Sequence, residues 1–161
     1  MKILFIEVDT VRAWAVASLG PAFIAAYLRQ HGHEVCFFRA GPEEPVSEVV
    51  ERVRALCPDL IGLSLTTRQW LRACALVAAI REQLDVPIVT GGLHPTFSPE
   101  HVLSCPGFDY VCLGEGEAAT LDLVQALEAS LPTDSIRNLW KAGAPRPSLR
   151  PPFEPIDALP F

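Results

Sequence analysis

The sequence contains no long uninterrupted run of apolar residues. A membrane-spanning helix needs about 20 such residues, whereas the first apolar run, after Met1 and Lys2, is soon interrupted by Glu7 and Asp9. This short run also lacks the length and composition of a secretory signal. We therefore expect no membrane anchor and no signal peptide, and we expect the protein to be cytoplasmic.

The sequence also has no excess of positive charge. It contains 13 lysine and arginine residues and 19 acidic residues, which give a net charge of −6. Nucleic-acid affinity depends largely on basic side chains that neutralise phosphates, so DNA and RNA are not expected partners. Half of the residues are hydrophobic, which excludes wholesale disorder. A chain of 161 residues is long enough to bury one substantial core.

The five cysteines are scattered and contain no CxxC spacing, which excludes a disulfide framework and a thiolate zinc site and favours a reducing compartment. No three of them have the CxxxCxxC spacing that would hold an iron–sulfur cluster. His31, His33 and Cys36 are close in sequence and resemble metal ligands. However, Gly32 is predicted to end a helix and His33 to begin a strand, so we expect no metal site there.

Several catalytic and nucleotide-binding motifs are absent. The sequence has no GxGxxG after its first apolar run, no GxxxxGK[ST] and no GxSxG, which argues against Rossmann dehydrogenases, P-loop enzymes and α/β-hydrolases. A phosphoacceptor receiver domain is unsupported too, because Ser64 stands where its aspartate is needed, and Leu113 or Gly114 where its lysine is needed.

Short, nearly continuous apolar runs alternate with helical patterns along most of the chain. Such runs are typical of strands buried on both faces, and the alternation predicts a parallel sheet with right-handed crossovers. We predict an α/β, doubly wound, five-stranded parallel sheet, flavodoxin-like or Rossmann-like in order 2-1-3-4-5, with helices on both faces. The strands are expected at residues 3–8, 34–38, 60–65, 87–91 and 109–113, and the helices after Gly20-Pro21, Pro45, Thr67 and Glu117, with a short one at Ser98-Pro99.

Residues 132–161 differ from the rest in being rich in proline and weakly periodic. We expect residues 1–131 to form the domain, and residues 132–161 to form an extended linker toward a further domain.

Sheets of this type bind ligands beyond the carboxyl ends of their strands, at the point where strand order reverses. Three loops at these strand ends are therefore candidate ligand-binding loops. Gly91-Gly92 follows the fourth strand, and the missing side chains would serve a ligand or a tight turn equally well. The Ser64 hydroxyl near the end of the third strand needs a partner, and Thr67 is a predicted helix cap. The Gly114–Glu117 loop brings exposed amide groups to a helix start, although its acids also simply favour a helix N-terminus.

Three motifs, which together extend over nearly the whole chain, resemble those of a known protein family. They are GGLHPTFSPE at 91–100, FDYVCLGEGEAATL at 108–121, and the proline-rich tail that ends in IDALPF. Together they resemble the N-terminal cobalamin-binding domain of cobalamin-dependent radical S-adenosylmethionine enzymes. This group includes methyltransferases and the anaerobic magnesium-protoporphyrin ester cyclase.

The resemblance implies a module that holds cobalamin with its nucleotide tail among the strand ends. In the full-length protein it also implies a C-terminal radical S-adenosylmethionine domain, which carries a 4Fe–4S cluster and S-adenosylmethionine. The implied cobalamin-binding residues are Asp9, Val11, Trp14, Ser64, Leu65, Thr66, Arg68, Gly91, Gly92, Leu93, His94, Gly114, Glu115 and Gly116. No residue of this chain is expected to be catalytic by itself.

The first loop departs from the methionine-synthase pattern Asp-x-His-x-x-Gly, because Val11 stands where the cobalt-binding histidine would be. The radical-enzyme branch resembles the methionine-synthase group in fold but lacks this histidine, so the difference agrees with the resemblance. We expect His94 to have a structural or rim role and no loop imidazole to reach cobalt. Replacing Gly92 by leucine is expected to block binding and leave the fold nearly intact. The alternative function is a docking or regulatory domain with the same fold and no cobalamin, since Trp14 and Trp70 would also suit a protein interface.

Overall fold

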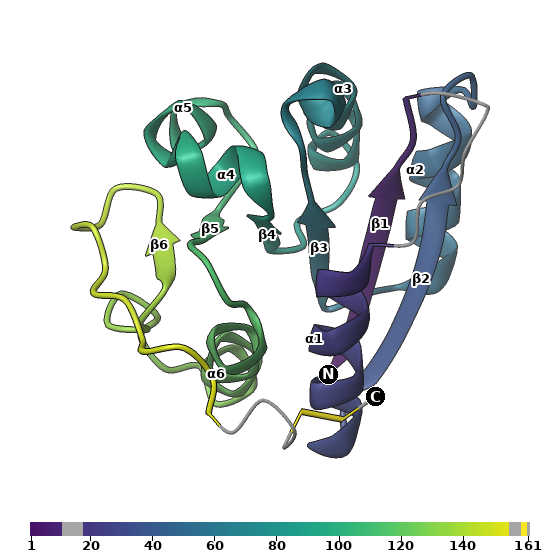
Figure 1. The fold of residues 1–161 in the computed structure, drawn as a ribbon. Helices are drawn as coiled ribbons and strands as arrows, with labels where there is room; N and C mark the ends of the chain where they lie inside the picture. The colour runs from purple at the N-terminus through teal and green to yellow at the C-terminus, as the bar shows by residue number, and fades with distance from the viewer. Residues whose placement is uncertain (11–17, 155–158, 161) are drawn as a thin grey trace.

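The computed structural model describes residues 1–10, 18–154 and 159–160, and it shows one sheet between two layers of helices (Figure 1). The strands are β1 Lys2–Val8, β2 Glu34–Ala40, β3 Leu60–Ser64, β4 Ile88–Gly91, β5 Tyr110–Cys112 and β6 Leu139–Lys141. The helices are α1 Leu19–Gln30, α2 Val46–Leu56, the 3₁₀ turn η1 Thr67–Gln69, α3 Trp70–Arg81, α4 Leu93–Phe97, α5 Pro99–Ser104 and α6 Glu117–Glu128.

The sheet order is β2-β1-β3-β4-β5-β6. The first five strands are parallel, in the predicted order, while β6 pairs antiparallel with β5 through Val111 opposite Trp140. The doubly wound fold is therefore confirmed, and a sixth strand extends it. This strand lies inside residues 132–161, so the sheet continues past residue 131, where the sequence predicted only linker.

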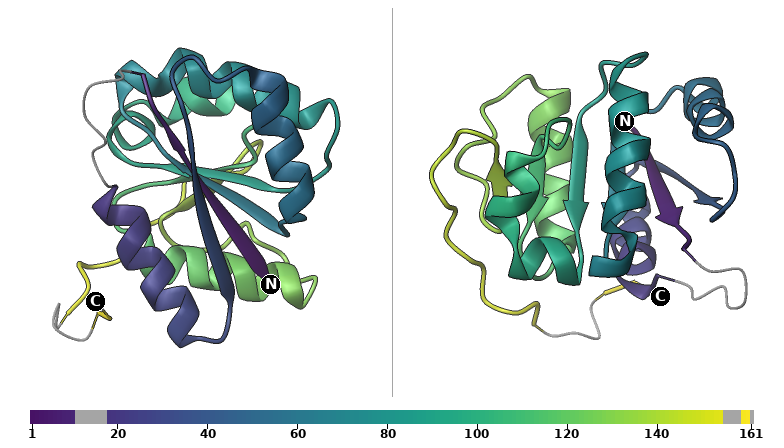
Figure 2. Two further views of the ribbon diagram at one scale, coloured as in Figure 1. Left: turned by 90° about the vertical axis from the view of Figure 1, so that its right-hand side faces the viewer. Right: turned by 90° about the horizontal axis from the view of Figure 1, so that it is seen from above.

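Alternation along the strands separates two apolar clusters, one on each face of the sheet. In β1, Ile3 and Phe5 belong to the cluster under α1 and α6, whereas Leu4 and Ile6 belong to the cluster under α2, α3 and α5. Successive strand side chains point to opposite faces, and both faces are covered (Figure 2). Nearly continuous apolar strands therefore fit this sheet.

Local signals explain where several helices begin and end. Gly32 has φ +85° just after α1, a conformation that glycine adopts readily, and Pro99 is the first residue of α5. The cap before α3 was predicted at Thr67, but Thr66 precedes η1 and holds the Gln69 side chain with both its amide and its hydroxyl. None of the described helices is long and apolar enough to span a bilayer.

Candidate functional site

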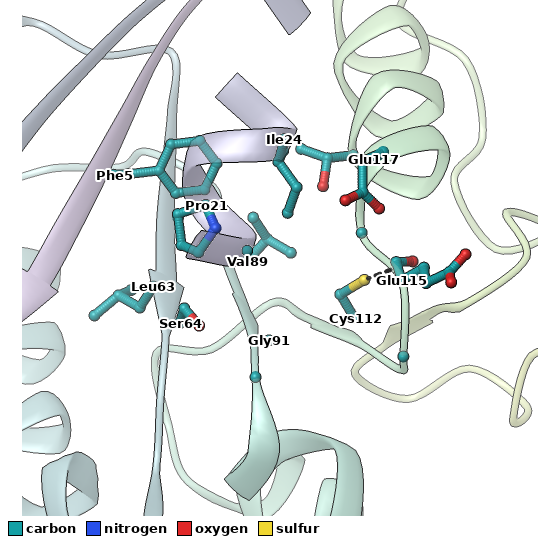
Figure 3. Close-up of a pocket in the computed structure, with 16 residues that line it drawn as sticks. Phe5, Pro21, Ile24, Leu63, Ser64, Val89, Gly91, Cys112, Glu115 and Glu117 are labelled. Carbon is teal, nitrogen blue, oxygen red and sulfur yellow. Dashed lines mark hydrogen bonds between the residues drawn. The ribbon is translucent and has the colours of Figure 1, made fainter. Parts of the chain in front are cut away.

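A cavity of about 350 Å³ lies at the carboxyl edge of the sheet, on the face covered by α1 and α6. The parallel register places Ser64 of β3 beside Gly91 of β4, and both line this cavity. Strands β1, β3, β4 and β5 provide the floor, while α1 and α6 provide the walls (Figure 3). The cavity therefore lies where doubly wound sheets bind their ligands.

Missing side chains create much of this space. Six of the ten glycines of the chain line the cavity: Gly20, Gly62, Gly91, Gly92, Gly114 and Gly116. The remaining lining is mainly apolar and includes Phe5, Pro21, Ile24, Leu63, Val89 and Cys112. A concave, mostly apolar pocket with a few polar groups is typical of small-molecule and cofactor sites.

Gly92 is needed for a close contact between two backbones. Its φ is +92° and its ψ is −168°, a region that is essentially restricted to glycine. A Cβ at this position would lie 2.8 Å from the Leu65 nitrogen and 2.9 Å from Ser64 Oγ. The expectation that leucine at position 92 leaves the fold nearly intact is therefore wrong, since the added side chain would meet the backbone of the β3 exit.

A second hollow adjoins the cavity and shares Ser64 and Gly92 with it. It has a volume of about 430 Å³, and the described residues that line it include several polar side chains. Those polar residues are Asp9, Thr10, Ser18, Thr66, Arg68 and Gln69. Together the two hollows form a site with an apolar part near the sheet and a polar part near the β1 and β3 exits.

The structure brings most of the predicted residues to these two hollows. Ser64 and Gly92 line both; Gly91, Gly114, Glu115 and Gly116 line the cavity; Asp9, Leu65, Thr66, Arg68 and Leu93 line the second hollow. Val11 and Trp14 lie outside the described residues.

Two of these polar side chains already have partners. The Asp9 carboxylate is 3.4 Å from Arg39 Nε, and the Thr66 hydroxyl donates to Gln69 Oε1 at 2.8 Å. The exposed Arg68 and the Ser64 hydroxyl are better placed to meet a ligand.

His94 lines neither hollow, unlike its neighbours Gly92 and Leu93. The residue is only 8% exposed, and the centre of its ring lies 4.8 Å from that of the Trp70 ring and 5.6 Å from that of the His101 ring. Burial, with a contribution from His101, lowers the pKa of His94 below its usual value. The predicted structural role agrees with this ring cluster on the α3 side of the sheet, and the predicted contact of His94 with cobalamin stays a prediction.

The Gly114–Glu117 loop forms the rim beside α6. Cys112, just before the loop, is 5% exposed, and its thiol lies 3.8 Å from the Glu115 carbonyl oxygen (Figure 3). Burial, with a contribution from the Glu117 carboxylate and against the Arg150 guanidinium, raises the pKa of Cys112 to about 12. Cys112 is therefore a neutral wall residue and not a thiolate ligand.

Neither hollow contains a protein imidazole. The four histidines of the chain are His31, His33, His94 and His101, and all four lie outside both linings. Within residues 1–10, 18–154 and 159–160, no group of three or more histidine, cysteine or acidic side chains is arranged to hold a metal ion.

The two helix walls and part of the floor were not predicted from the sequence. Ile24 of α1 and Thr120 of α6 line the cavity, and helical periodicity alone did not distinguish them from core residues. Gly62 inside β3 carried a usable signal, because an interior strand glycine often marks a close approach. The Phe5 ring fills that space, and a Cβ at Gly62 would lie 2.4 Å from it.

The fold and the paired hollows define an α/β domain that binds a large, partly apolar ligand at the carboxyl edge of its sheet. A family model described as "B12 binding domain" matches residues 10–124, and the chain belongs to this family. The family predicted from the sequence motifs is therefore confirmed, and the chain is a cobalamin-binding domain.

Curated relatives include enzymes that are much longer than this chain. An anaerobic magnesium-protoporphyrin IX monomethyl ester cyclase of Synechocystis is 40% identical over 116 residues, which are 68% of this chain and 23% of the relative. An uncharacterized methyltransferase of Pyrococcus horikoshii is 34% identical over 137 residues, or 79% of this chain and 29% of the relative. The chain thus spans less than a third of either relative.

Solved structures share the fold at low sequence identity. The cobalamin-dependent S-adenosylmethionine radical enzyme OxsB, with aqua-cobalamin and S-adenosylmethionine bound, has a TM-score of 0.78 at 19% identity, covering 93% of this chain and 22% of that one. The radical S-adenosylmethionine methyltransferase TsrM from Kitasatospora setae, with cobalamin and a [4Fe-4S] cluster bound, has a TM-score of 0.76 at 20% identity, covering 86% and 26%. Both likenesses support the α/β fold described above.

Proposed function

We propose that this chain is the cobalamin-binding module of a larger radical S-adenosylmethionine enzyme, and that the glycine-lined cavity receives the nucleotide tail of cobalamin. The observation that carries this proposal is the cavity itself, at the carboxyl edge between α1 and α6, with the polar hollow opening beside it.

The chemistry of the two hollows fits the two parts of the cofactor. The nucleotide tail ends in a flat aromatic base, which suits a pocket lined by glycines, Phe5, Ile24 and Val89. The corrin ring carries amide side chains, which suit the hydroxyl, amide and guanidinium groups of the second hollow. Ser64, at the junction, can hydrogen-bond a polar group of the tail.

When bound, cobalamin supplies a cobalt centre that can carry a methyl group or change oxidation state. The part played by this chain is to bind the cofactor, orient its reactive face away from the sheet and shield its tail from water. The 4Fe–4S cluster, S-adenosylmethionine and the methyl-transfer or related radical chemistry belong to the remainder of the larger protein. Residues beyond β6 would connect the module to that domain.

Gel filtration after mixing the protein with hydroxocobalamin tests the proposal. We expect the corrin absorbance to co-elute with the protein at about one equivalent, because the apolar cavity holds the nucleotide tail. Complete loss of the cofactor on the column, from a protein with a native far-ultraviolet spectrum, would favour a docking or regulatory domain instead.

A further inference from the structure

A buried asparagine joins the cavity rim to the segment that follows the sixth strand. Asn138, directly before that strand, is 4% exposed and has φ +65°. Asparagine is one of the few residues other than glycine that adopt this conformation readily. The Asn138 backbone accepts from the Leu113 amide at 2.7 Å and donates to the Ser148 carbonyl at 3.0 Å.

Its side chain makes two further bonds in opposite directions. Nδ2 donates to the Glu115 carbonyl oxygen at 3.1 Å, inside the rim loop of the cavity. Oδ1 accepts from the Arg150 amide at 2.6 Å. One residue therefore fixes both the rim loop and the chain that passes outside it.

Residues 148–153, here called the strap, run from α6 to α1. The Arg150 guanidinium pairs with Asp122 of α6, the Phe153 amide donates to Glu115 Oε2 at 2.7 Å, and the Phe153 ring meets the Tyr27 ring of α1 edge to face at 5.7 Å. Figure 1 shows this yellow segment leaving β6, passing α6 and heading toward α1. These helices are the two walls of the cavity.

We propose that Asn138 is a positioning residue for the rim loop Gly114–Glu117 and that the strap holds α1, α6 and this loop around the cavity. Residues after position 131 then belong to the ligand site and are not only a connection to another domain. The strap limits the opening of the cavity, so it slows the escape of a bound tail. The identity of the tail rests on the proposed function, whereas the positioning of the loop does not.

The thiol of Cys112 provides a readout that needs no cofactor. It lines the cavity, touches the Glu115 carbonyl and is nearly inaccessible when the loop is in place. Local opening of the loop exposes it to a small alkylating reagent. Cys36, on β2, lines neither hollow and serves as the internal control for global unfolding.

Asn138→Gly is the most informative variant, because glycine keeps the left-handed backbone and its two bonds and removes both side-chain bonds. Asn138→Asp keeps the acceptor for Arg150 but loses the donor to Glu115. Ser148→Ala is the matched control, because Ser148 contributes its backbone carbonyl to this arrangement. All three are made in the full chain and compared with the unmodified protein.

Pulse alkylation with iodoacetamide, read peptide by peptide, measures the two thiols in the absence of ligand. We expect Asn138→Gly to raise the Cys112 rate about tenfold through loss of two hydrogen bonds, with the Cys36 rate unchanged. Asn138→Asp should give a smaller rise, and Ser148→Ala none. Equal rises at both cysteines, or no rise at Cys112, would overturn the positioning role.

Release of hydroxocobalamin, followed by exchange against cyanocobalamin, is then measured on the same proteins. We expect faster release from Asn138→Gly in proportion to the Cys112 rate. If the unmodified protein binds no cobalamin, the proposed function fails while the alkylation result still decides the role of Asn138. If cobalamin binds but its release is unchanged in a variant with an exposed Cys112, the strap does not retain the tail.

Discussion

Gly92 lies so close to Ser64 that a Cβ on the glycine would be 2.9 Å from Ser64 Oγ. The same Cβ would be 2.8 Å from the Leu65 nitrogen, and backbone cannot move aside as the end of a flexible side chain can. The β4 exit thus holds the β3 exit in place, and the ligand site depends on this contact.

Gly92→Ala should therefore reduce stability, by roughly 2–4 kcal/mol, through backbone strain at φ +92° and overpacking against β3. Urea denaturation followed by circular dichroism measures this. A loss below about 0.5 kcal/mol, the level of an ordinary surface substitution, would contradict the close packing of the two exits.

Gly91→Ala separates an effect on ligand binding in the cavity from an effect on the stability of the fold. A Cβ at Gly91 would lie 3.5 Å from Cys112 Cβ, an ordinary contact, while occupying space inside the cavity. We expect nearly unchanged stability and a cobalamin dissociation constant raised about tenfold, or about 1.4 kcal/mol. Gly41→Ala, whose Cβ would meet only Glu44, is the matched control. Equal affinities of the two variants would place the tail elsewhere.

Ser64→Ala tests the polar contact at the junction of the two hollows. Loss of one neutral hydrogen bond should weaken cobalamin binding by roughly 0.5–1.5 kcal/mol. Isothermal titration calorimetry is suitable, with Ser104→Ala as the control, because Ser104 bonds the His101 carbonyl on the exposed end of α5. If both variants bind equally well, Ser64 does not contact the cofactor.

Acid should destabilise the fold through His94. Its pKa in the folded protein is lowered by burial, so the folded state binds a proton less readily than the unfolded state. Stability is then fully present above the ordinary histidine pKa of about 6.5 and falls as pH decreases below it. His33 has the same direction of shift, also led by burial, and contributes separately.

The His94→Phe variant, which keeps a ring beside Trp70, should lose less unfolding free energy between pH 7.5 and 5.5 than the unmodified protein. Thermal denaturation at both pH values measures the difference, with His33→Asn run in parallel to isolate the second histidine. An identical pH dependence in His94→Phe and the unmodified protein would show that His94 is not held neutral by burial.

Much of the fold could be predicted because its signals are local. The five parallel strands are short apolar runs, and α1, α2 and α6 have clear helical spacing. In contrast, β6 has only three residues, and its pairing with β5 depends on tertiary contacts such as Ala142 with Asp109. The five-residue helix α4 contains Pro95, and its length is too small for periodicity to show.

The site could be predicted where chemistry coincides with a strand end. Ser64, Gly91-Gly92 and the Gly114–Glu117 loop were all singled out from their positions and do lie together. The family resemblance included His94 among the cofactor-binding residues, and the turn into α4 buries its ring on the opposite face with Trp70. The role of Asn138 could not be inferred, since all of its partners are set by long-range packing.

We propose that cobalamin binds with its tail base drawn into the cavity and with no protein imidazole available to cobalt. Both hollows exclude all four histidines, and Val11 stands in place of the usual ligand. Electron paramagnetic resonance of the bound cobalt(II) form tests this most directly. We expect a spectrum without superhyperfine splitting from an axial nitrogen; a threefold splitting from one nitrogen would contradict this mode of binding.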